Sequence, residues 1–139
     1  MNGRLIPSND DYQGGETDKL LLLYVLLKEK NATSLLSTQP LRSDMTQIHH
    51  IFPKVLLKGT YSEELIEDIA NKTFTIAKEN LRIGNKEPIE YLWGRVMDDV
   101  LEAHFIPRDP SLLKKEKFEE FLKERRRLII EGLNKYFSA

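Results

Sequence analysis

Two of the three histidines, His49 and His50, stand side by side within residues 47–54, among apolar residues and shortly before Pro53. An imidazole near its ordinary pKa can take a proton from water at physiological pH, and it can bind a metal ion through a ring nitrogen. Neighbours on a strand point to opposite faces, so the two rings diverge unless the strand ends and the backbone turns, which Pro53 allows. By itself such a pair is most often structural or surface-exposed. If the strand ends there and both rings face one cleft, the pair could instead form the catalytic edge of a metal-assisted hydrolytic site, and the residues that follow favour this hypothesis.

Two asparagines follow the histidine pair along the chain. Asn71 opens a β-branched and aromatic run, residues 71–76, which alternates and predicts a second strand. Asn80 comes nine residues later, on a short helix predicted at residues 77–82 that Gly84 and Asn85 should stop. A strand-strand-helix unit is therefore expected to carry both histidines and both amides.

The flanking segments predict a mostly helical α+β domain. A helix is expected at residues 18–31, capped by Thr17 or Asp18, and Thr60 with Glu63 has the spacing of a capping box for a helix ending near residue 70. Further helices are expected at residues 88–103 and 111–137, and residues 1–17 form an irregular lead-in. The side chains expected to point inward from the last two helices are Ile89, Leu92, Trp93, Val96, Val100, Phe118, Phe121, Leu122, Leu128, Ile129 and Leu133.

Composition excludes several classes of protein. With 139 residues, 40% of them hydrophobic, the chain is one domain with a real core rather than a disordered segment. A net charge of -1 gives no sign of a polyanionic partner, so nucleic-acid contact must come from a local basic patch. The absence of cysteine excludes disulfides and thiolate zinc sites and fits a reducing cytoplasm. The longest apolar run, residues 20–27, is far shorter than the ~20 residues that span a bilayer, and core burial explains it better than an exposed contact with another subunit or domain.

The order and spacing of the histidines and asparagines resemble the HNH endonuclease family. The nine-residue step from Asn71 to Asn80 matches the usual step between the middle and last motif positions of that family. The sequence segments around these residues resemble the C-terminal HNH module of GmrSD-type proteins. Those are modification-dependent restriction and phage-defence proteins with an N-terminal ParB-like nucleotidase domain. The segments are HHIFPK at 49–54, IANKT at 69–73, IGNK at 83–86 and HFIP at 104–107.

The resemblance covers most of the chain, from about Leu5 onward, and implies a metal-dependent endonuclease acting on DNA. It places an HNH nuclease domain at residues 18–139, with a ββα-metal (His-Me finger) core at about 46–87. It also implies that the nucleotidase domain is missing from this chain, and a homodimer is compatible with the same reading.

The family's roles transfer to this chain position by position. By resemblance His50 is the general base and Asn71 orients it, while His49 and Asn80 bind one divalent cation, Mg²⁺ or Mn²⁺. Asn85 stands one residue beyond the offset at which some members carry a further ligand. Histidine and asparagine would hold the cation weakly, leaving positions for phosphate and water.

Basic residues around the motif are candidates for contacts with backbone phosphates. They are Lys54, Lys72, Arg82 and Lys86. Glu79 and Glu87 partly cancel their charge, so weak DNA binding by this module alone is expected. A further domain or a dimer partner would have to contribute.

Plainer interpretations remain beside these. His104 packs or caps the helix that it follows, or else reaches the site. The run of arginines at 125–127 is a solvated helix face paired with Glu120 and Glu124, or else a DNA contact. The whole domain could instead be a non-catalytic nucleic-acid-binding or scaffold module with the HNH shape, or a ribonuclease, because the motif acts on phosphate rather than sugar. A structural zinc site is disfavoured because such sites usually need four strong ligands.

Overall fold

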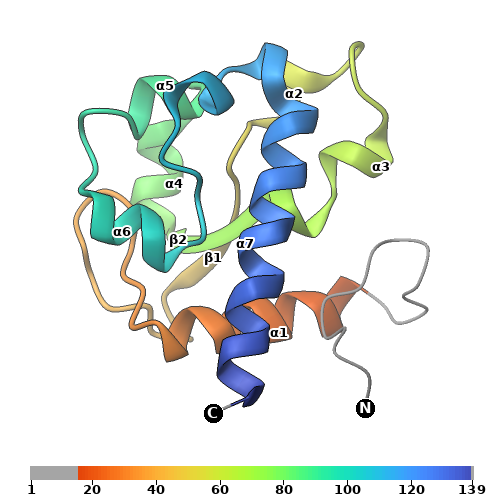
Figure 1. Cartoon of the computed structure of the whole chain (residues 1–139). Helices are drawn as coiled ribbons and strands as arrows, with labels where there is room; N and C mark the ends of the chain where they lie inside the picture. Colours follow the sequence, from red (N-terminus) through yellow and green to blue (C-terminus); the bar gives the residue numbers. More distant parts are fainter. Residues whose placement is uncertain (1–15, 139) are drawn as a thin grey trace.

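The computed structural model describes residues 16–138, and these form an α+β fold that is mostly helical, as predicted (Figure 1). A two-stranded antiparallel sheet, β1 (Thr46–His50) and β2 (Lys72–Ile76), lies behind the long C-terminal helix α7 (Phe118–Ser138). The first helix, α1 (Glu16–Glu29), contacts both α7 and β2. The remaining helices are α2 (Lys54–Leu57), α3 (Glu63–Ile66), α4 (Ala77–Ile83), α5 (Pro88–Tyr91) and α6 (Asp98–Ala103), and the 3-10 helices are η1 (Ile69–Asn71), η2 (Pro110–Leu113) and η3 (Lys115–Lys117).

The register of the sheet decides which side chains share a face. His49 pairs with Thr73 and His50 pairs with Lys72. Directly opposed residues of an antiparallel pair project to the same face, and successive residues project to opposite faces. β1 continues through His50, so the two histidines belong to different faces of the sheet. β2 runs without a loop into α4, which completes the expected strand-strand-helix unit.

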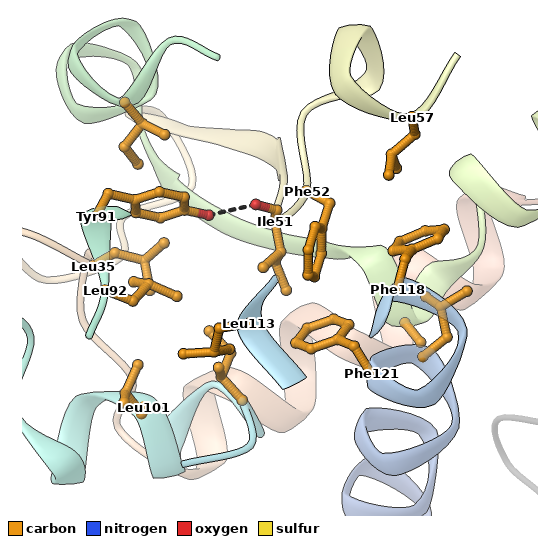
Figure 2. Close-up of a cluster of buried hydrophobic side chains, with 14 of the residues drawn as sticks. Leu35, Ile51, Phe52, Leu57, Tyr91, Leu92, Leu101, Leu113, Phe118 and Phe121 are labelled. Carbon is orange, nitrogen blue, oxygen red and sulfur yellow. Dashed lines mark hydrogen bonds between the residues drawn. The ribbon is translucent and has the colours of Figure 1, made fainter. Parts of the chain in front are cut away.

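The core is packed around α7. Its first turns place Phe118 and Phe121 edge-on against Phe52, with ring centroids 5.2 and 4.9 Å away (Figure 2). A second cluster joins α1 to the C-terminal half of α7 and contains Leu23, Leu26, Leu27, Ala32, Leu41, Ile69, Phe105, Ile129 and Leu133. One face of the leucine run, Leu23, Leu26 and Leu27, is therefore core, as predicted, whereas Leu21 and Val25 are 61% and 40% exposed, so α1 is not buried on most sides. No helix of the described part of the chain is long and apolar enough to cross a membrane.

The boundaries near the histidines agree with the sequence. α1 begins at Glu16 and ends at Glu29, β2 covers 72–76, and α4 ends at Ile83. Its C-cap is Gly84, whose φ of 56° is a value that glycine adopts freely. Most of the predicted lead-in, residues 1–15, lies outside the described residues, and the two that follow are already helical.

Three predicted helices differ from the structure. The helix expected to end near residue 70, α3, ends at Ile66, and residues 69–71 form the separate η1. The cap of α3 is Ser62 rather than Thr60, because the Ser62 hydroxyl accepts from the Leu65 N–H at 3.3 Å. The helix expected at 88–103 is divided into α5 and α6, since Gly94 takes a φ of 74° that no helix accommodates. This break leaves Trp93 43% exposed, which corrects its assignment to the core.

The last helix begins at Phe118 instead of Ser111. Lys114 is extended, with φ -106° and ψ 146°, and the backbone N–H of Lys115 donates to a carboxylate oxygen of Glu87 at 2.7 Å. This tertiary contact replaces a helical hydrogen bond. The preceding η2 still buries Leu113 completely.

The arginine run was wrongly predicted to be a uniform solvated face. Arg125 is fully buried and donates to four backbone carbonyls, those of Ile69, Ala70, Lys72 and His104. Burial lowers its pKa to about 9, which still leaves a cation at neutral pH. Arg125 therefore ties α7 to η1, to the start of β2 and to the end of α6. Arg127 does lie on the solvated face, paired with Glu124 and Glu131, whereas Arg126 binds the buried carboxylate of Asp68.

Candidate functional site

The His49 ring lies between α4 and α5 and is 2% exposed. Its Nδ1 is 2.8 Å from Oδ1 of Asn80, which lies 31 residues further along the chain. Its Nε2 is 2.9 Å from the Tyr91 hydroxyl, and that hydroxyl donates to the carbonyl of Ile51 at 2.6 Å (Figure 2). The structure thus brings His49 and Asn80 together, with a tyrosine behind the ring.

This chain of contacts favours the tautomer of His49 that carries its hydrogen on Nε2. A phenol carries one hydrogen, and the Ile51 carbonyl can only accept, so the Tyr91 hydrogen is committed to Ile51. Burial raises the pKa of Tyr91, so the hydroxyl keeps that hydrogen. The Tyr91 oxygen must therefore accept from Nε2–H of His49. In a neutral ring, Nδ1 then carries only a lone pair.

The ring is neutral at physiological pH. Burial lowers the pKa of His49 to about 4, and the charge of the neighbouring His50 lowers it further, against the opposing effect of the Asn80 contact. The bare Nδ1 consequently faces an amide oxygen, which is also a lone-pair donor. Two arrangements satisfy such a pair: rotation of the Asn80 amide to present its NH₂ group, or a cation bound by both atoms.

Asn80 is positioned by Glu79, its neighbour on α4. The Glu79 carboxylate is 1% exposed and accepts from the backbone N–H groups of Leu36 and Ser37 at 2.8 and 2.9 Å. It also accepts from the hydroxyls of Ser34, Ser37 and Thr75. Burial opposes ionisation, but these donors outweigh it and lower the pKa of Glu79 to about 2. Glu79 is thus a fixed carboxylate that ties α4 to the segment after α1. The expectation that it partly cancels the charge of the surrounding basic side chains is therefore wrong.

Asn71 is fully buried and holds the backbone after the histidines. Its carbonyl accepts from Ile51 N–H at 2.8 Å, and its side-chain oxygen accepts from Phe52 N–H at 2.9 Å. Its amide donates to the carbonyls of Phe52 and Ile66 at 3.2 and 3.0 Å. These contacts involve the chain rather than the His50 ring, which differs from the expectation that Asn71 orients that ring directly.

His50 lies in a separate, charged cluster. Its Nε2 is 3.2 Å from each carboxylate oxygen of Glu67, and its side chain is 24% exposed. Lys54 and Lys72 contact the same carboxylate at 2.9 and 3.1 Å. The expectation that both rings face one cleft is therefore wrong: β1 continues through His50, so the two histidines point to different faces of the sheet and have different neighbours.

The remaining candidates divide by exposure. Arg82 and Lys86 are exposed at and beyond the end of α4, where phosphate could reach them, and Asn85 is exposed beside Lys86. The Lys72 side chain is 5% exposed and already paired with Glu16 and Glu67, so it is poorly placed for such a contact. Lys54 is 41% exposed and better placed.

His104 is the C-cap of α6, and its ring is buried. Its Nε2 donates to the Thr33 carbonyl and its Nδ1 accepts from the Thr73 hydroxyl, both at 2.6 Å. Both ring nitrogens are occupied, so the packing role predicted for His104 is the one that the geometry supports.

Sequence reasoning missed Tyr91 and Glu67, which contact the two histidines. Tyr91 has the pattern of a core residue in an amphipathic helix, and its hydroxyl gives no periodic signal. Glu67 follows α3 as one of several acidic residues, and nothing in its spacing sets it apart. Among residues 16–138 no three His, Cys, Asp or Glu side chains lie close enough together to hold a metal ion.

Comparison with known proteins adds little to the geometry. No family model matches the chain. The chain is 29% identical over 114 residues to an uncharacterized protein of Methanocaldococcus jannaschii, MJ0686, and the match covers 61% of this chain and 20% of that protein. The chain thus corresponds to about a fifth of the length of this relative, whose name describes no activity.

Proposed function

We propose that this domain is a metal-dependent endonuclease of the HNH type, in which β1, β2 and α4 form a ββα-metal unit acting on DNA. The observation that supports this most strongly is the meeting of His49 Nδ1 and Asn80 Oδ1 at 2.8 Å, from β1 and α4. The tautomer set by Tyr91 makes Nδ1 available as a ligand. Histidines that bind metals commonly donate their other ring N–H to an oxygen in this way.

The donor set fits a weakly held divalent cation such as Mg²⁺ or Mn²⁺. One neutral nitrogen and one amide oxygen leave most coordination positions to water and phosphate. When bound, such a cation would stabilise charge on the scissile phosphate and on the leaving oxygen. The protein contributes a preset ring orientation through Tyr91 and a preset helix position through Glu79.

His50 is the base in this proposal; because its ring lies on the other face of the sheet from the His49 ring, the proposal requires the scissile phosphate to lie across the end of β1 and reach both. The His50 ring is more exposed than that of His49, so water can reach a ring nitrogen that could take its proton. Asn71 holds the backbone of Ile51 and Phe52, which follows His50 directly, and so limits how far the ring can move. Lys54, Arg82 and Lys86 are the basic side chains that could bind phosphate from the described surface.

Nicking of supercoiled plasmid in Mg²⁺ or Mn²⁺ tests the activity. His50→Ala should lower the nicking rate by about 10²–10⁴-fold, the usual contribution of a general base. His104→Gln is the matched control, because it replaces a histidine whose ring nitrogens are both occupied within the fold. Equal nicking by wild type and His50→Ala would exclude His50 as the base. Cleavage of RNA but not DNA would redirect the proposal to a ribonuclease.

Metal titration distinguishes an enzyme from a non-catalytic module of the same shape. Calorimetry with Mn²⁺ should show one saturable site that disappears in His49→Ala and in Asn80→Ala. A non-catalytic scaffold should show no binding that depends on these residues.

A further inference from the structure

We infer that Glu67 is the positioning residue of His50, orienting the ring from the segment between α3 and η1. The inference rests on the proposed function for its catalytic meaning, but the contact itself can be tested without activity. Both oxygens of Glu67 lie 3.2 Å from Nε2 of His50. An ionised carboxylate can only accept, so Nε2 carries the hydrogen and, in the neutral ring, Nδ1 carries the lone pair that can receive a proton.

The Glu67 carboxylate is immobilised by two cations from different elements. Lys54 of α2 contacts one oxygen at 2.9 Å, and Lys72 of β2 contacts the other at 3.1 Å. Although burial opposes ionisation, the hydrogen bonds from Lys54, Lys72 and His50 outweigh it and lower the pKa of Glu67 to about 2. Glu67 therefore remains a carboxylate throughout the neutral range.

The position of Lys72 beside Glu67 follows from the pairing of the two strands. It is the cross-strand partner of His50, so its ammonium group approaches Glu67 from the same face of the sheet as the imidazole. Its side chain is 5% exposed, and its second partner is Glu16 of α1 at 2.7 Å. Residues of α1, α2 and β2 thus form one charged network that includes the Glu67 carboxylate beside His50.

Asn71 and Glu67 divide the positioning between them. Asn71 holds the backbone beyond His50, and its amide also donates to the carbonyl of Ile66, the residue immediately before Glu67. Asn71 therefore fixes the separation between the two segments, and Glu67 fixes the rotation of the ring. A side-chain carboxylate carries out the orienting role that the family resemblance gave to the asparagine.

The direct test is the Nε2-bound proton of His50, observed by ¹⁵N-edited NMR. In the wild type this proton should exchange slowly with water and resonate downfield, because it is donated to a carboxylate. Glu67→Ala should remove the resonance through fast exchange. Glu63→Gln is the matched control: Glu63 also contacts Lys54, at 3.7 Å, but is 67% exposed, and this variant should keep the resonance.

The kinetic test separates orientation from binding. Glu67→Ala should lower kcat for plasmid nicking by about 10–100-fold, the usual effect of losing an orienting partner. KM should not rise, because the substitution removes a negative charge near the DNA. Glu67→Gln, which keeps an oxygen acceptor, should retain more activity than Glu67→Ala.

The outcomes are distinguishable. Loss of the resonance only in Glu67→Ala, with inactive wild-type protein, would support the orienting contact while overturning the nuclease. A resonance and a kcat that both survive Glu67→Ala in an active protein would overturn the inference and leave the proposed nuclease intact.

Discussion

Two buried histidines, His49 and His104, have nearly the same electrostatic environment but different chemical status. Burial lowers the pKa of each to about 4. His104 donates to a carbonyl and accepts from a hydroxyl, so its hydrogen-bonding capacity is satisfied inside the protein. His49 donates to Tyr91 and turns a bare nitrogen toward the Asn80 oxygen. A shifted pKa thus accompanies burial in both, and the two differ in that Nδ1 of His49 faces an amide oxygen, a contact that either rotation of the Asn80 amide or a bound cation would satisfy.

The largest expected effect on stability comes from Arg125, which contacts the His104 segment by donating to the His104 carbonyl. Arg125→Met should lower the free energy of unfolding by about 3–5 kcal/mol, since several buried carbonyls would lose their donor. Chemical denaturation measures this. Arg127→Met, on the solvated face of the same helix, should change stability by no more than about 0.5 kcal/mol. Similar stabilities for the two variants would contradict the conclusion that the buried Arg125 holds these segments together.

The next effect is the pH dependence contributed by His104. Its pKa is 6.5 in the unfolded chain and about 4 in the folded protein, so between these values the unfolded state binds a proton that the folded state does not. Stability should therefore fall as the pH falls from 6.5 to 4, by about 3 kcal/mol for this residue at ~1.4 kcal/mol per pH unit.

Denaturation curves at pH 7 and pH 4 measure this loss. In His104→Gln, which cannot take up the proton, the difference in stability between the two pH values should be smaller than in the wild type. If the stability difference between pH 7 and pH 4 is the same in His104→Gln as in the wild type, His104 is not the group whose lowered pKa causes it.

The smallest expected effects come from two substitutions, each of which removes the hydroxyl group that contacts one of the two histidines. Thr73→Val takes away the donor to His104 and should cost about 1–3 kcal/mol of stability without altering Mn²⁺ affinity. Tyr91→Phe takes away the acceptor of His49 Nε2–H and frees the other tautomer. It should weaken Mn²⁺ binding by about tenfold or more, in addition to any loss of stability.

Calorimetry with the two variants side by side tests this pair. If Tyr91→Phe and Thr73→Val have the same Mn²⁺ affinity, the tautomer argument for His49 fails. If Thr73→Val also weakens binding, the two histidines are coupled and the separation of their roles is wrong.

The local elements near the histidines were predictable because their signals are local. The alternation at 71–76, the short helix after it and the stop at Gly84 all follow from periodicity and from the conformational freedom of glycine. The later helices were less predictable. Gly94 divides one of them, and the contact between Lys115 and Glu87, far apart in the sequence, delays the start of the other.

Of the candidate site, only the contact between His49 and Asn80 was predictable. The spacing of His49 and Asn80 indicated a pair that the fold does bring into contact. The orienting partners were not predictable, because Tyr91 and Glu67 reach the histidines from elements whose placement depends on the whole core. Arg125 was misassigned for the same reason: within an arginine run nothing local indicates which side chain faces the interior.

The sequence by itself determined the strand-strand-helix order and the residue types available for chemistry, since both follow from periods and spacings of a few residues. Only the tertiary structure decided that His49 and His50 occupy different faces of the sheet, with different partners. The physical reason is the two-residue period of a strand: β1 continues through His50, and α3, α4 and α5 then supply a separate environment to each ring.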